Sequence, residues 1–259
     1  ALSILLSSAF YECIRDKHSE LKPITAYVDP DPINGLKDAL RSLLNIDYKT
    51  AVETTLEMLD VLPPSLGLRV RDLARLGAEI ASNKALLRRD FAGRIYHEIT
   101  GDIALRKGFA TYYTEVPAAY LLAGLAVEAL FGLDRTPLPQ VDEREARSLL
   151  NKIKTVIAGD LACGSGTLLT ASYYALQRLA RALAFYHDLG VSVDEVGKVL
   201  VEECIYGIDA LKYASQITAI NLALMSPGNI TKENVYTIYL GCIEPKQQAW
   251  LGSLELLDD

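Results

Sequence analysis

One short stretch, residues 155–169, constrains the fold more than any other part of the chain. It begins with an apolar, β-branched run that reaches Asp160 and continues with a turn of small residues and a long helix-forming segment. This order predicts a strand, a tight loop and the start of a helix. In open parallel sheets ligands lie beyond the carboxyl ends of the strands, where glycines let the backbone approach closely. We therefore interpret this stretch as a cofactor site.

Strands and helices alternate through the rest of the second half. Ser192-Val-Asp-Glu195 matches a capping box and predicts the start of a helix. The expected elements are strands at 204–209 and 234–240, and helices at 167–189, 192–202 and 211–225. Such alternation is typical of parallel strands joined by right-handed crossovers, so we predict an α/β fold for this half.

The first half is predicted to be helical. Leucines recur at helical spacing in segments that Pro30, Pro32 and the pair Pro63-Pro64 separate. We expect a domain of four or five helices over residues 1–90, with a packing or docking role, and a second domain over 91–259. Helices are also expected at 116–131, with Thr114 as the N-cap, and at 142–151.

Charge narrows the partners that the chain can have. The net charge of −7 argues against a protein whose whole surface binds nucleic acid. A basic cluster keeps two interpretations open, contact with DNA phosphates and an ordinary solvated helix face. The cluster comprises Lys84, Arg88, Arg89, Arg94, Arg106 and Lys107.

Cysteine, histidine and hydropathy exclude further classes. The four cysteines form no Cys-x-x-Cys pair and the three histidines have no metal-cluster spacing, so we predict no metal site and no disulfide framework. The most apolar window, residues 116–132, is shorter than the ~20 residues of a spanning helix and contains Glu128. The chain also begins without a basic leader. We therefore expect a cytoplasmic protein without a membrane span.

Two acidic residues end successive predicted strands, Asp160 beside the glycine loop and Asp209 after the next crossover. An acidic residue at the end of the second strand suits the hydroxyls of a ribose. A dinucleotide site fits less well, because Leu169 stands where a third glycine should be and Asp209 lies much further along than the ~20 residues expected. A phosphate-binding P-loop is excluded, because no Gly-Lys-Ser/Thr follows. The acid before the loop would repel a pyrophosphate and suit an α-ammonium group. A ribose and an α-ammonium group, without a pyrophosphate, are the features of S-adenosylmethionine.

The amino-acid sequences of these motifs are similar to those of one family. Asp160-Leu-Ala-Cys-Gly-Ser-Gly-Thr-Leu-Leu169 resembles the Asp-Pro-Ala-Cys-Gly-Ser-Gly-Thr-Phe-Leu motif of the S-adenosylmethionine-dependent N6-adenine DNA methyltransferases, particularly restriction-modification subunits and modules. Thr111-Tyr-Tyr-Thr114 resembles that family's Tyr-Tyr-Thr-Pro element. Tyr206-Gly-Ile-Asp209, before a helix ending Asn221-Leu-Ala-Leu224, resembles its second-strand motif. The resemblance implies the first part of a Rossmann-like methyltransferase domain with parallel strands.

The resemblance also implies a role for each matching residue. The tyrosine motif would approach the methionine end of the cofactor, Asp160 its amino group and Asp209 its ribose hydroxyls. Ala210 and Leu211 would flank the adenine, and Cys163 is interpreted as a small loop residue rather than a nucleophile. The implied cofactor-binding residues are Thr111, Tyr112, Tyr113, Thr114, Asp160, Ala162, Cys163, Gly164, Ser165, Gly166, Asp209, Ala210 and Leu211.

No catalytic residue can be named, because the family's Asn-Pro-Pro-aromatic motif, which holds and stacks on a flipped-out adenine, does not occur in the sequence. We expect an inactive N-terminal fragment of a longer enzyme, or half of a split one. Its partners would be double-stranded DNA with a flipped adenine and specificity and nuclease subunits or domains. The alternatives are a non-catalytic cofactor-binding or assembly module, and a methyltransferase that acts on RNA or on protein glutamine.

Overall fold

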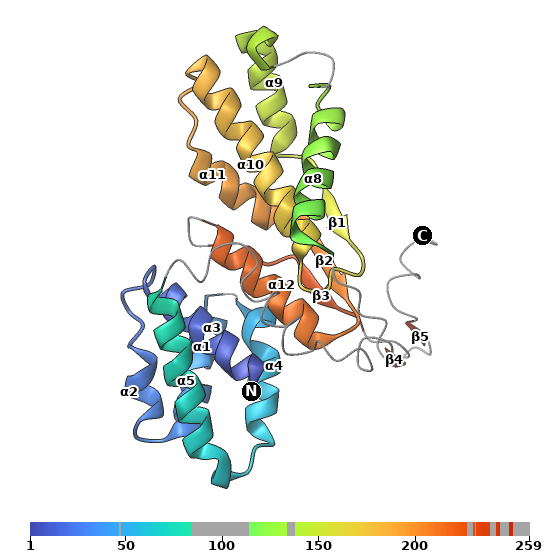
Figure 1. Ribbon diagram of the computed structural model, residues 1–259. Coiled ribbons are helices and arrows are strands. Elements are labelled where there is room, and N and C mark those ends of the chain that lie inside the picture. Colours follow the sequence, from blue (N-terminus) through green and yellow to red (C-terminus); the bar gives the residue numbers. More distant parts are fainter. Residues whose placement is uncertain are drawn as a thin grey trace.

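The computed structural model describes residues 1–46, 48–83, 114–133, 138–226, 230, 232–238, 242–243 and 249–250 (Figure 1). Its N-terminal helices are α1 (Leu2–Arg15), α2 (Ile24–Val28), α3 (Pro32–Leu44), α4 (Lys49–Asp60) and α5 (Gly67–Ser82), with a short 3-10 turn at Pro64–Leu66 before α5. After the gap come α8 (Val116–Leu130), a 3-10 turn at Leu138–Gln140, α9 (Glu143–Ile153), α10 (Thr167–His187), α11 (Val193–Val199) with a π-helical turn at Leu200–Cys204, and α12 (Lys212–Met225). The strands are β1 (Ala158–Asp160), β2 (Ile205–Asp209), β3 (Val235–Thr237), β4 (Cys242–Ile243) and β5 (Ala249–Trp250).

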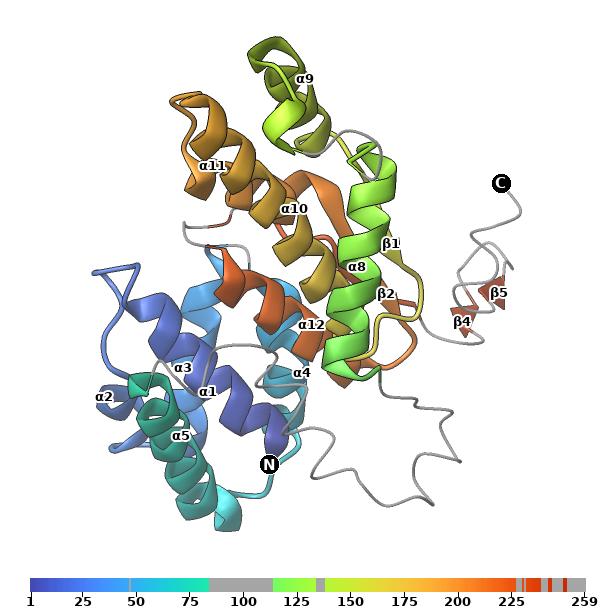
Figure 2. The same cartoon turned by 45° about the horizontal axis from the view of Figure 1, so that its top comes forward.

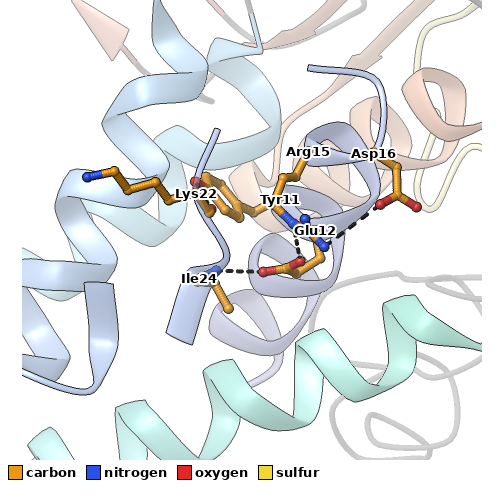
Figure 3. Close-up of polar contacts among 6 residues, drawn as sticks. All are labelled: Tyr11, Glu12, Arg15, Asp16, Lys22 and Ile24. Carbon is orange, nitrogen blue, oxygen red and sulfur yellow. Dashed lines mark hydrogen bonds and ion pairs between the residues drawn. The ribbon is translucent and has the colours of Figure 1, made fainter. Parts of the chain in front are cut away.

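The helices of residues 1–83 were predicted as a class, and their polar contacts explain two of the turns. Asp31 caps α3 by accepting a hydrogen bond from the backbone N–H of Asn34 at 3.1 Å. Glu12 of α1, almost fully buried, accepts from the N–H of Ile24 and from Arg15 Nε, both at 2.6 Å (Figure 3). The hydroxyl of Tyr11 donates to the carbonyl of Lys22 at 2.8 Å. These bonds fix the turn between α1 and α2, because the buried carboxylate has backbone and cationic partners.

The predicted parallel sheet is present as three strands in the order β1-β2-β3. Gly207 lies opposite Asp160 on one side and Val235 on the other. The first strand is shorter than the apolar run suggested. The backbone N–H groups of Thr155 and Val156 donate to the carbonyl of Lys152, so these residues close the end of α9 instead. The described part therefore has an α/β fold in which short strands follow long helices.

Helices α10 and α12 cover the same face of this sheet. A Cβ on Gly207 would lie 3.0 Å from Leu169 of α10 and 3.4 Å from Thr218 of α12. Alternate residues of the strands point to the opposite face, where Tyr236 is 47% exposed. The start of α10 and the middle of α12 therefore lie over this face, beside the ends of the strands.

Helix α12 lies between the sheet and the N-terminal helices (Figures 1 and 2). Nε2 of Gln216 donates to Ser7 Oγ at 2.8 Å, Thr55 Oγ1 at 2.9 Å and the carbonyl of Ala51 at 3.0 Å. Lys212 pairs with Glu57, and the hydroxyl of Thr50 donates to the carbonyl of Val235. One contiguous apolar core extends from α1 to β3. The N-terminal helices therefore pack against α12.

Helix α11 begins where its capping box predicted. Ser192 caps it by accepting a hydrogen bond from the N–H of Glu195 at 3.3 Å. Residues 84–113, which hold the expected boundary near residue 90 and the basic cluster, lie outside the described residues. Within the described part, no helix combines the length and the apolar character needed to cross a bilayer.

Candidate functional site

The glycine loop between β1 and α10 is a tight turn that needs glycine at two positions. Gly164 has φ +55° and Gly166 has φ +81°, in the left-handed region that side chains disfavour. The N–H of Cys163 donates to the carbonyl of Ile208 at 2.8 Å, and that of Gly166 donates to the carbonyl of Cys163 at 2.7 Å. The loop is thereby folded over the end of β2, and α10 begins directly after it.

Asp209, at the end of β2, holds the loop directly. One carboxylate oxygen accepts from the N–H of Gly164 at 2.8 Å, and the other accepts from the N–H of Leu211 at 2.9 Å. A carboxylate has about four lone-pair sites, so each oxygen keeps one for a further donor. The structure therefore brings together the second acidic residue and the loop that the sequence placed 45 residues apart.

Asp160 adds a second carboxylate to the same strand ends. Its Oδ1 accepts from the N–H of Ala162 at 3.1 Å. Burial raises the pKa of Asp160, and the nearby charge of Asp209 raises it further. Among the described residues, neither Asp160 nor Asp209 forms an ion pair with a lysine or arginine. Two neighbouring carboxylates without a cation favour a ligand that carries positive charge and hydroxyl donors.

Cys163 is a packed loop residue. It is only 5% exposed, and burial raises the pKa of its thiol to about 12. Because the thiolate is the nucleophilic form, this environment makes Cys163 inert at neutral pH. The side chain fills the space that Gly207 leaves open, with its sulfur 3.3 Å from the place of a Cβ on that glycine.

We expect native protein at pH 8 to leave Cys163 unmodified by a thiol reagent such as iodoacetamide. Peptide mapping by mass spectrometry would measure the labelled fraction, with the urea-unfolded chain as the positive control and the partly exposed Cys13 as an internal comparison. Labelling of Cys163 as fast as that of Cys13 would contradict the packed assignment.

The residues expected beside the adenine lie directly after β2. Ala210 and Leu211 connect Asp209 to α12, which begins at Lys212, and both are partly exposed. They are therefore adjacent to the Asp209 carboxylate at the carboxyl ends of the strands. Ser165 is buried, and its hydroxyl lies 3.1 Å from that of Thr167.

The tyrosine motif is only partly described. Thr111, Tyr112 and Tyr113 lie outside the described residues. Thr114 is partly exposed, and the prediction that it caps α8 is wrong: Glu115 is the N-cap residue, without a side-chain bond, because the helix starts at Val116.

Helix α8 brings Thr114 to the same end of the molecule as the loop. Figure 2 shows α8 lying beside α10. Ala119, near the N-terminal end of α8, belongs to a small apolar cluster with Ala171 of α10, and Leu168 of α10 packs against this cluster. Further along, the rings of Tyr120 and Tyr174 stack with centroids 5.8 Å apart. The packing of the N-terminal part of α8 on the start of α10 thus brings Thr114 toward the glycine loop.

Two residues of α12 that the sequence did not single out as site residues also contact the loop. The hydroxyl of Thr218 donates to the carbonyl of Gly164 at 2.9 Å, and Nδ2 of Asn221 donates to the carbonyl of Ser165 at 3.0 Å. Their spacing of three residues was the available signal, because it places two polar side chains on one face of the helix.

Comparisons of the chain with protein-family models, curated proteins and solved structures gave no match. The interpretation of the site therefore depends on its residues and their geometry.

Proposed function

We propose that the loop between β1 and α10 binds S-adenosylmethionine, and that the chain is the cofactor-binding portion of an N6-adenine DNA methyltransferase. The observation that carries this proposal is the direct contact between Asp209 and the N–H of Gly164. It joins an acidic second-strand residue to a glycine loop, the arrangement that binds the ribose and backbone-facing side of nucleoside cofactors in α/β folds.

The charge at the site supports this cofactor over a nucleotide phosphate. S-adenosylmethionine carries a sulfonium and an α-ammonium group, whereas ATP and dinucleotides carry a pyrophosphate. Asp160 and Asp209 together would repel the pyrophosphate and attract the cationic groups. In this assignment Asp160 accepts from the ammonium group, and Asp209 accepts from the ribose hydroxyls through its remaining lone pairs.

Adenine-specific methylation is proposed from the resemblance of the motifs at residues 111–114, 160–169 and 206–209 to those of the N6-adenine DNA methyltransferases. Direct transfer to an amino nitrogen needs no covalent enzyme intermediate, and the packed, high-pKa thiol of Cys163 is compatible with such a reaction. The sequence offers no Asn-Pro-Pro-aromatic motif to present a flipped adenine. The role proposed for these residues is therefore to bind and orient the methyl donor, with double-stranded DNA as the acceptor of the whole enzyme.

We expect isothermal titration calorimetry to detect one S-adenosylmethionine and one S-adenosylhomocysteine per chain. ATP and NAD are the matched controls, and they should bind far more weakly, because their phosphates would face two carboxylates. Absence of S-adenosylmethionine binding, or equal affinity for ATP, would reject the proposed site.

A further inference from the structure

The middle of α12 has polar side chains on two opposite faces, although almost all of it is buried. Thr218 and Asn221 are three residues apart and share the face toward the glycine loop, which each contacts by a hydrogen bond. Gln216 lies on the other side and donates to groups of α1 and α4. Helix α12 is therefore bonded to the N-terminal helices on one side and to the glycine loop on the opposite side.

The two bonds on the front face determine which way the peptide groups of the loop point. Peptide units are planar, and in the trans form the N–H points opposite to the C=O of the same unit. The described residues include no cis peptide bond. Because Thr218 holds the carbonyl of Gly164 toward α12, the N–H of Ser165 must point away from α12. Among the described residues, no atom lies within 4 Å of the position of a Cβ on Gly164, so on their side the backbone is open to a ligand there.

The loop also lies on α12 at very short range. A Cβ on Gly166 would be 2.9 Å from both the methyl group and the hydroxyl of Thr218. Thr218 therefore limits the loop sterically at Gly166 while it orients the peptide of Gly164. Gly164 is also held from the side of the sheet, because its N–H donates to Asp209.

We propose that Thr218 and Asn221 are positioning residues, which hold the glycine loop in the conformation that binds the cofactor. This inference rests on the proposed function, because the cofactor is taken to be S-adenosylmethionine. Neither side chain contacts the cofactor in this assignment. They act through the carbonyls of Gly164 and Ser165, and the N-terminal helices support them through Gln216.

The test compares the same substitution at two buried helical threonines. Thr218→Val removes the hydroxyl that holds the loop, and we expect the dissociation constant for S-adenosylmethionine to rise about five- to tenfold. Thr218→Ser keeps the hydroxyl and should restore binding to within about twofold of the wild type. Thr170→Val in α10 is the control, because its buried hydroxyl has no partner among the described residues, and its affinity should be unchanged.

Calorimetry on the full chain gives the dissociation constants, and thermal unfolding without ligand checks that each variant is folded. Asn221→Leu is a second variant that removes the other donor and should change the affinity in the same direction. If the wild type binds and Thr218→Val binds equally well, the positioning role is wrong while the proposed function stands. If the wild type does not bind, both are overturned.

Discussion

Asp209→Ala is expected to weaken S-adenosylmethionine binding by about 2 to 3 kcal/mol, because a charged acceptor of hydroxyl bonds is lost. This corresponds to about 30- to 150-fold in the dissociation constant. The structure adds a second cause, since the same carboxylate accepts from the N–H groups of Gly164 and Leu211. A weaker affinity alone would therefore not separate the ribose contact from the loss of loop geometry.

The two causes can be separated by comparing adenosine with 2′,3′-dideoxyadenosine by calorimetry. The wild type should discriminate between these ligands, and Asp209→Ala should lose that discrimination, because ligand and residue form one interaction pair. A variant that binds both ligands more weakly but still discriminates between them would reject the ribose contact.

Asp160→Asn is the matched control for charge. It keeps an oxygen that can accept from the N–H of Ala162 while it removes the negative charge. It should weaken S-adenosylmethionine, which carries the ammonium group, and leave adenosine affinity nearly unchanged. Equal loss of both ligands would contradict the assignment of Asp160 to the amino group.

Gln216→Leu is expected to lower the free energy of unfolding by about 2 kcal/mol, because Ser7 and Thr55 lose a buried donor. The substitution keeps most of the side-chain volume, so the effect arises from hydrogen bonds rather than from a cavity. For a chain of this size, the midpoint of thermal unfolding should fall by about 4 to 8 °C. Urea unfolding followed by circular dichroism would measure the free energy.

The control for this prediction is the triple variant Ser7→Ala, Thr55→Val, Gln216→Leu. Replacing all three polar side chains by apolar groups of similar shape leaves only backbone carbonyls such as that of Ala51 without these donors, and it costs much less than removing one side chain and leaving its partners unsatisfied. The triple variant should therefore be more stable than Gln216→Leu alone. A triple variant that loses the sum of three separate losses would show that these residues do not act as one network.

The elements of the second half follow from local sequence. The alternation of apolar runs and helical segments predicted β2 and α12, and the capping box predicted the start of α11 at Ser192. The first strand was predicted too long, because the N–H groups of Thr155 and Val156 both donate to the carbonyl of Lys152 at the end of α9. The helices of residues 1–83 were predicted only as a class, without bounds for each helix. Helix α1 is buried on nearly all sides, which blurs the period that marks an amphipathic helix.

The amino-acid sequence by itself determined the strand, the glycine loop, the helix after it and the two acidic residues at the strand ends. Those signals are local, since they depend on apolar periodicity, on glycine at positive φ and on caps. Only the tertiary structure decided that Asp209 holds the N–H of Gly164, that Thr218 holds its carbonyl and that Gln216 supports α12 from the N-terminal helices. These contacts join residues 45 to 209 positions apart, and no local pattern determines which of many polar side chains will meet once the core is packed.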